Sequence, residues 1–130
     1  MEAPSLAVRL PLPPPRLSPN ARTHWRPKAR ATRSYRTAAA FYARDAMATA
    51  GIRGGWTDAE VQAEFFFPTS HRRDADNLLA SLKAAFDGLA DAGVVTNDRN
   101  LIHLPVMQSK DRDDPRVVLR ITPRRTDARS

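Results

Sequence analysis

Cysteine is absent from the 130-residue sequence, so disulfide bonds and thiolate metal sites are excluded. No apolar run approaches the length that a membrane-spanning helix requires. The first residues also lack the basic start and the long apolar stretch of a secretory signal peptide. We therefore expect a cytoplasmic protein that has no membrane partner.

Acidic residues are also missing from a long stretch, because the chain has no aspartate or glutamate between Ala3 and Arg44. Across the whole sequence, 21 Lys and Arg residues outnumber 14 Asp and Glu residues, and the formal net charge is +7. This imbalance favours a phosphate-rich partner, and nucleic acid is the polyanion that we expect. Trp25 and Tyr35 lie among the basic residues, an arrangement that suits phosphate contact and base stacking. A solvated loop whose charge only maintains solubility is an equally good interpretation of this segment.

Hydrophobic periodicity predicts a short series of strands and helices. Alternating apolar residues predict strands over residues 6–12, 61–67, 101–107 and 117–121. Helical spacing predicts two helices, over residues 39–50 and 76–92. Gly51 and Gly93 are expected to end these helices. The prolines at 13–15 close the first strand, and we expect a long basic loop from there to about Arg33.

The predicted element order is β-α-β-α-β-β. A chain of this length forms one domain with a modest core. We expect the α+β fold class, with two helices packed on one face of a small mixed sheet. This domain is expected to occupy residues 1–122, and the basic segment 123–130 is expected to be a frayed tail.

Asp74 and Asp76 lie where the loop after the second strand enters the second helix. In a non-helical turn, two carboxylates at i and i+2 can converge on one ion. Mg²⁺ typically takes one or two protein carboxylates together with water and phosphate oxygens. The alternative is that one of these residues only caps the helix, which aspartate does well.

Lys83 follows on the same predicted helix. At 100° per residue, Asp76, Lys83 and Asp87 lie within about 20° of one another, away from the apolar stripe. The lysine side chain leans toward the helix N-terminus and can bring its ammonium near a phosphate held beside Asp76. The alternative is a surface ion pair between Lys83 and Asp87 at i, i+4.

Three segments of the chain resemble those of the RusA-type Holliday junction resolvases. They read Arg-Arg-Asp-Ala-Asp-Asn-Leu at 72–78, Lys-Ala-Ala-Phe-Asp-Gly-Leu at 83–89 and Ala-Gly-Val-Val-Thr-Asn-Asp at 92–98. The end of the first strand and the Ser-Pro-Asn turn at 18–20 are also similar, so the resemblance covers about residues 8–118. It implies a homodimeric, Mg²⁺-dependent endonuclease of a kind that phages and prophages often encode.

Carried over by position, the resemblance implies that Asp74, Asp76 and Asp98 are the metal-binding carboxylates and that Lys83 is the catalytic lysine. Mg²⁺ is the implied cofactor, with Mn²⁺ as a substitute, and no small-molecule substrate is expected. The implied reaction is hydrolysis of DNA phosphodiesters in a four-way junction, with two symmetric cuts made by the two subunits. The implied role is in DNA recombination and repair.

The chain departs from the family pattern in two places. Asn97 stands where the family usually has the first of two adjacent acids, and Asp98 preserves the second. Counted forward from Asp76, the family's lysine position falls on Ala80, whereas counted back from the next motif it falls on Lys83. Three extra residues between the motifs account for this difference.

DNA contacts are expected from polar and basic side chains in two segments: Asn20, Arg22, Arg26, Lys28, Arg30, Arg33, Arg36, Arg72 and Arg73. Two other functions remain open. One is a non-catalytic nucleic-acid-binding protein that kept the fold but lost cleavage, with Asn97 as the first trace of that loss. The other is a basic structural protein bound to RNA, which the clustered carboxylates disfavour because they repel phosphate.

Overall fold

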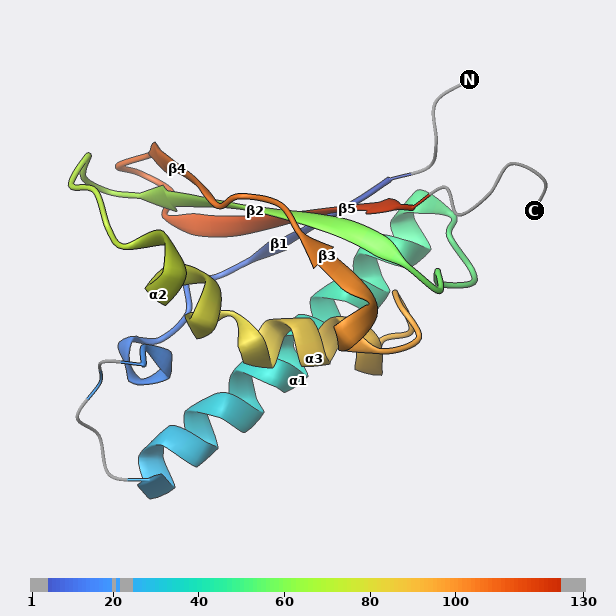
Figure 1. The fold of residues 1–130 in the computed structure, drawn as a ribbon, viewed down its shortest axis with the longest axis horizontal. Coiled ribbons are helices and arrows are strands. Elements are labelled where there is room, and N and C mark those ends of the chain that lie inside the picture. The colour runs from blue at the N-terminus through green and yellow to red at the C-terminus, as the bar shows by residue number, and fades with distance from the viewer. Residues whose placement is uncertain (1–4, 20, 22–24, 125–130) are drawn as a thin grey trace.

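One twisted sheet forms a layer of the molecule, and the helices cover one of its faces (Figure 1). The computed structural model describes residues 5–19, 21 and 25–124. The architecture confirms the expected α+β class, with helical segments packed on a small mixed sheet. No helix in this described part of the chain has the length and apolar character needed to span a membrane.

The sheet has five strands in the order β1-β5-β2-β3, with β4 beside the other half of β2. β5 is antiparallel to both β1 and β2, whereas β3 and β4 are parallel to β2. The parallel pairs follow from the helical crossover that leaves β2 and returns to its neighbour. The strands are β1 (Leu6–Leu10), β2 (Ala59–Phe67), β3 (Leu101–His103), β4 (Met107–Lys110) and β5 (Arg116–Pro123).

The single strand predicted over residues 101–107 is wrong in extent, because the structure has two short strands there, β3 and β4. Pro105 lies between them, and proline has no N–H with which to continue a ladder. Its carbonyl oxygen instead accepts a hydrogen bond of 2.5 Å from the side-chain amide of Gln62. The Leu104 N–H still bonds to the Val61 carbonyl, so the interruption is local.

The basic loop predicted to reach Arg33 is also wrong, because helix α1 begins much earlier and spans Trp25–Ala50. Its buried residues are Tyr35, Ala39, Ala40, Ala43 and Met47, which all lie in the second half or middle of the helix. The first two turns therefore have no large apolar side chain facing the core, and periodicity does not detect them. Pro27 is tolerated because the first turn needs no N–H donor there. Several of the predicted DNA-contacting cations therefore lie on a helix.

The second predicted helix is broken into α2 (Ala75–Ser81) and α3 (Lys83–Asp91). Leu82, between them, has φ −94° and ψ 3°, and its N–H bonds to the carbonyl of Leu79 in a tighter turn. The Ser81 hydroxyl donates to the carbonyl of Leu78 at 2.7 Å, a local bond that competes with the regular helical ladder. The apolar stripe continues through the break, because Leu82 is fully buried.

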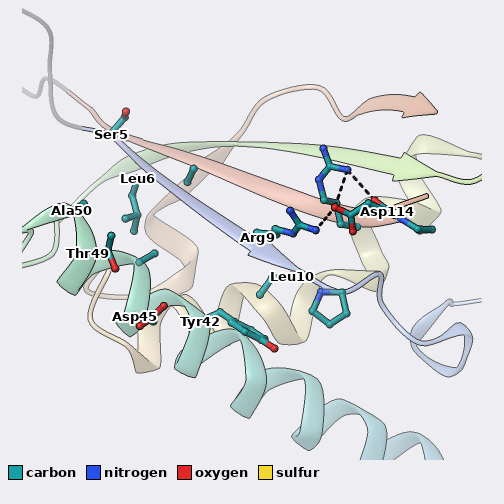
Figure 2. Close-up of a pocket in the computed structure, with 14 residues that line it drawn as sticks. Ser5, Leu6, Arg9, Leu10, Tyr42, Asp45, Thr49, Ala50 and Asp114 are labelled. Carbon is teal, nitrogen blue, oxygen red and sulfur yellow. Dashed lines mark hydrogen bonds and ion pairs between the residues drawn. The ribbon is translucent and has the colours of Figure 1, made fainter. Parts of the chain in front are cut away.

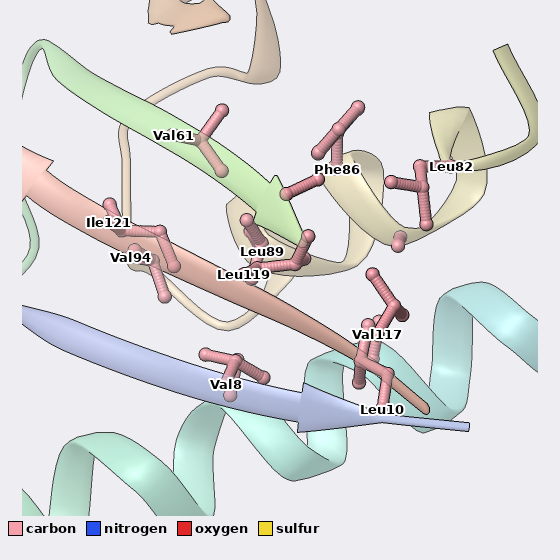
Figure 3. Close-up of a cluster of buried hydrophobic side chains, with 14 of the residues drawn as sticks. Val8, Leu10, Val61, Leu82, Phe86, Leu89, Val94, Val117, Leu119 and Ile121 are labelled. Atoms are coloured by element: carbon pink, nitrogen blue, oxygen red, sulfur yellow. The ribbon is translucent and has the colours of Figure 1, made fainter. Parts of the chain in front are cut away.

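The core fills the space between the sheet and α1 and α3 (Figure 3). Residues of β2 alternate between buried and partly exposed, which places one set of side chains against the helices. Gly51 and Gly93 follow α1 and α3 with φ of 73° and 86°, which confirms the two helix ends predicted from glycine. The face of the sheet away from the helices carries polar pairs such as Arg120 with Glu64, at 2.8 Å.

α1 and α3 approach each other closely at Gly88. A Cβ atom at this position would lie 2.5 Å from the Arg36 carbonyl oxygen and 2.8 Å from the Ala39 Cβ. These distances are well inside van der Waals contact, so only glycine fits without moving one helix. The contact fixes the part of α1 that carries Arg36 against the acidic side of α3.

Candidate active site

Asp74 is the N-cap of α2, as the alternative interpretation of this residue predicted. Its Oδ1 accepts hydrogen bonds from the N–H groups of Asp76, at 2.9 Å, and Asn77, at 3.2 Å. These bonds satisfy two donors that have no partner within the helix. The side chain of Asp76 lies in the first turn, and both carboxylates are exposed at the same helix start.

Asp98 is held at the start of a short 3₁₀ helix, η2 (Asp98–Asn100). Asn97 caps that helix, since its Oδ1 accepts from the Arg99 N–H at 3.1 Å. The asparagine that departs from the family pattern therefore has a structural role that an amide oxygen performs well. Asp98 itself is only partly exposed and points to the start of α3.

Lys83 contacts two carboxylates. Its Nζ lies 2.6 Å from Oδ2 of Asp98 and 2.9 Å from Oδ1 of Asp87. The hydrogen bonds to Asp98 and then Asp87 raise the pKa of Lys83, and the same lysine lowers the pKa of Asp98. The predicted pair with Asp87 is confirmed. The prediction that one continuous helix carries Asp76 together with Lys83 and Asp87 is wrong, because the break at Leu82 places Asp76 in α2 and the other two residues in α3.

The three predicted metal ligands are not gathered into one cluster. In the part of the chain that the structure describes, no group of three or more His, Cys, Asp or Glu side chains lies close enough to hold a metal ion. The donors nevertheless suit Mg²⁺ in kind, because this cation takes hard oxygen ligands and usually one or two protein carboxylates. Within the described residues, Oδ2 of Asp74 and both carboxylate oxygens of Asp76 accept no hydrogen bond.

Two of the predicted DNA-contacting arginines are engaged within the protein. Arg36 donates to the two carboxylate oxygens of Asp91 at 2.6 and 2.8 Å, which raises the pKa of Arg36 and lowers that of Asp91. Its Nη1 also lies 4.0 Å from Asp87. Arg73 stacks its guanidinium 3.7 Å above the ring centroid of Phe67. Both arginines therefore have structural contacts in addition to the contact with DNA expected of them.

The remaining predicted contacts are distributed over α1 and the loop before α2. Arg26, Arg30 and Arg33 are exposed on the first turns of α1, and Arg72 is exposed beside Asp74. Lys28 borders a groove of about 270 Å³ that Lys83 and Asp87 also border. Asn20 and Arg22 lie outside the described residues.

Sequence reasoning missed Asp91 and Gln108 as members of this region. Asp91 is one helical turn beyond Asp87, so the two acids lie on the same side of α3. This i, i+4 spacing could have predicted an ion pair with the basic helix α1. Gln108 holds the backbone before Asp74, because its side-chain amide exchanges hydrogen bonds of 3.0 and 2.8 Å with the N–H and carbonyl of Arg73. This contact joins residues 35 positions apart in the sequence, so no pattern of neighbouring residues predicts it.

Another groove lies away from these residues. It has a volume of about 670 Å³ and runs between the free edge of β1 and α1 (Figure 2). Arg9 and Asp114 pair at one end of it, and Tyr42 forms part of the other wall. None of the residues predicted for metal or DNA binding lines this groove.

Comparison with known proteins gives two matches. The model of the family described as "Endodeoxyribonuclease RusA" matches residues 11–122. A protein of Xylella fastidiosa, described as "Uncharacterized protein", is 34% identical over 124 residues, which span 89% of this chain and 75% of that relative. The segment matched by the family includes Asp74, Asp76, Lys83 and Asp98.

Proposed function

The chain belongs to the RusA family of endodeoxyribonucleases, and on this basis we propose that it resolves four-way (Holliday) DNA junctions by metal-dependent hydrolysis. The observation that carries the proposal is the contact between Lys83 and Asp98. It joins the start of α3 to the loop before β3, so a cationic donor and an acid from two separate motifs meet at one place. The other two carboxylates of the proposed site, Asp74 and Asp76, lie separately at the start of α2.

Asp74, Asp76 and Asp98 are the residues that would hold Mg²⁺, with Mn²⁺ as a substitute. When bound, such a cation supplies Lewis acidity to a phosphate and its attacking water. The start of α2 suits this role, because Asp74 keeps one oxygen available while the other caps the helix. Fixing one oxygen by two backbone N–H groups orients the carboxylate before substrate arrives.

Lys83 would stabilise the negative charge that develops on the phosphate during hydrolysis. An ammonium has three N–H donors, and two of them are directed to Asp87 and Asp98. The third donor remains for a phosphate oxygen. Asp87 and Asp98 would thereby hold the Lys83 ammonium in place and leave one of its N–H groups for the substrate.

The exposed cations would hold the DNA backbone around this site. Arg72 lies two positions before Asp74 in the chain and is exposed, and Arg30 and Arg33 are exposed on α1. Each contact of this kind displaces counterions and adds affinity without reading sequence. Two copies of the chain related by a two-fold axis would present two such sites to a junction, which has a similar symmetry, and cut two strands in recombination and repair.

The test uses labelled four-way junction, linear duplex and flap DNA, each with and without Mg²⁺. We expect paired cuts in the junction alone, and only with the cation. Asp74→Asn, Asp76→Asn and Asp98→Asn should each abolish cutting while junction binding survives, because losing a negative charge lessens repulsion of DNA. Asp45→Asn, an exposed acid on α1, is the matched control and should cut normally.

The same experiment distinguishes the proposed function from the main alternative, which is a DNA-binding protein that has lost the ability to cleave. That alternative predicts tight junction binding by the unaltered protein and no cutting with either Mg²⁺ or Mn²⁺. Cutting by Asp76→Asn at the parent rate would instead exclude the assignment of the α2 carboxylates.

A further inference from the structure

A groove of about 620 Å³ opens beside Asp74, between the proline segment that follows β1 and helix α2. The chain after β1 passes next to α2 in this region (Figure 1). Its volume lies within the range of about 300–1,000 Å³ that is typical of small-molecule sites. Its interior is mainly apolar, with Phe65 and Phe67 among the lining residues.

The wall formed by Pro13, Pro14 and Pro15 is rigid. Each proline ring fixes its own φ, so this segment has little conformational freedom to lose on binding a ligand. The hydroxyl of Tyr35, which is buried on α1, donates to the carbonyl of Pro11 at 2.6 Å. The N–H of Leu17 bonds to the Pro14 carbonyl at 2.9 Å. The wall is therefore anchored at both ends.

The opposite side is also built by tertiary contacts. Gln108 holds the backbone of Arg73 through two hydrogen bonds, and the guanidinium of Arg73 covers the ring of Phe67. The Arg73 Nη1 donates to the His71 carbonyl at 2.7 Å. A cation is thus fixed at the mouth of an apolar groove, immediately before Asp74.

Asn77 supplies the groove with a hydrogen-bonding group that the protein does not use. Its side chain is partly exposed on α2 and lines the groove. Within the described residues, its side-chain amide makes no hydrogen bond. An amide presents one acceptor and two donors, which is the pattern that pairs with the edge of a nucleobase.

We propose that this groove binds an unpaired nucleobase of the DNA strand that is cut, next to the phosphate at Asp74. This proposal rests on the proposed junction-cutting function. The interior is too apolar for a phosphate, whereas Arg73, which lines the groove, attracts the backbone of the strand. A base has the required flat apolar faces and polar edge, and a base already unpaired at a branch point enters with the least loss of stacking.

The test begins with a four-way junction whose cut positions have been mapped with the unaltered protein and Mg²⁺. Each nucleotide within a few positions of a cut is then replaced, one at a time, by an abasic site. Binding is measured in EDTA and cutting is measured with Mg²⁺. We expect one position at which the abasic site weakens metal-free binding by about 5- to 150-fold, the range that stacking of one base gives. Cutting should slow at the same position.

A fluorescent base gives a second readout that needs no metal. 2-Aminopurine at the position identified should change its emission on binding, because its stacking partners change. Asn77→Phe, which fills the groove, should abolish that change and should make binding insensitive to the abasic site. Asn77→Ala should reduce the difference in cutting among the four bases at that position. Ala48→Phe adds an exposed aromatic on α1 and should leave all three signals unaltered.

The outcomes distinguish the two proposals. Absence of any cut in the unmodified junction would refute the proposed function. Normal cutting with equal binding of every abasic junction would leave that function intact and overturn the base-binding groove. A 2-aminopurine signal that persists in a folded Asn77→Phe protein would also overturn it. If Asn77→Phe does not fold, as judged by thermal melting, the abasic series with the unaltered protein still decides the question.

Discussion

The ammonium nitrogen of Lys83 lies 2.6 Å from Oδ2 of Asp98, which ties the first turn of α3 to the start of η2. These residues are 15 positions apart and come from two different motifs. The lysine side chain is largely exposed, so one face of its ammonium is open to a ligand. Replacement of Lys83 therefore tests whether the residue acts in the cleavage reaction or only stabilises the fold.

We expect Lys83→Ala to cut the cleavage rate sharply while junction affinity changes little. The reason is that a contact formed with developing charge is stronger in the transition state than in the bound substrate. Loss of an exposed ion pair should change the free energy of unfolding by about 1 kcal/mol or less. Single-turnover cleavage, binding titration and denaturant unfolding measure the three effects. Cleavage at the parent rate would remove Lys83 from the chemistry.

Asp87 is expected to act as a positioning residue for Lys83. Its Oδ1 holds the ammonium at 2.9 Å, so Asp87→Asn should slow cleavage in the parent protein. In a Lys83→Ala background the same change should have no further effect, because the group that it orients is gone. Asp91→Asn, one turn along the same helix, is the control, since Asp91 pairs with Arg36 instead. An equal loss in both backgrounds would show that Asp87 acts independently of Lys83.

The Lys83–Asp98 pair also predicts a pH dependence. The pKa of Asp98 is lowered from its ordinary value of 3.8, chiefly by Lys83, so its stabilising effect is present above that value and is lost as pH falls through the folded-state pKa. The pKa of Lys83 is raised from 10.5, so its contribution is complete below 10.5 and is lost as pH rises through the raised value. The stability difference between parent and Lys83→Ala should therefore be constant near neutral pH and vanish at both extremes. A carboxyl titration by NMR should show the pKa of Asp98 rising in Lys83→Ala, and an unchanged value would contradict the pairing.

Local patterns were sufficient to predict the parts of the fold that depend on neighbouring residues. Alternation in β2, the N-cap at Asp74 and the i, i+4 pair of Lys83 with Asp87 are all encoded within a few positions. The start of α1 was missed, because its first turns carry cations in place of large apolar residues. The break at Leu82 was missed, because the apolar stripe continues through it.

The contacts that assemble the candidate site depend on tertiary structure and could not be read from spacing. Lys83 reaches Asp98 because β3 pairs in parallel with β2 and brings η2 back toward α3. Gln108 reaches Arg73 because β4, which follows Asp74 only after the helical crossover and β3, pairs with the end of β2. The register of parallel strands is set by the whole sheet, so no short window of sequence contains these contacts.

Gly88→Ala tests the close approach of α1 and α3. The added methyl would meet the Arg36 carbonyl oxygen and the Ala39 Cβ, so the helices must separate. We expect a loss of about 1–3 kcal/mol in the free energy of unfolding, which is typical of overpacking. Gly54→Ala is the matched control, because a Cβ at Gly54 would meet no atom within 4 Å. Equal stability of the two variants in denaturant unfolding would show that α1 and α3 do not depend on glycine for their contact.

The arginines of α1 are expected to divide into two groups according to their partners. Arg30 and Arg33 are exposed and make no ion pair within the described residues, so Arg30→Gln with Arg33→Gln should weaken junction binding without loss of stability. The slope of log affinity against log salt should fall in magnitude by about two units, at close to 0.9 for each lost phosphate contact. Arg36→Gln should instead lower stability, because its guanidinium holds Asp91 through two hydrogen bonds. Arg53→Gln, an exposed arginine beyond the end of α1, is the control for a general effect of charge. An unchanged slope in the double variant would mean that this face of α1 is solvated in the complex and that its charge serves solubility alone.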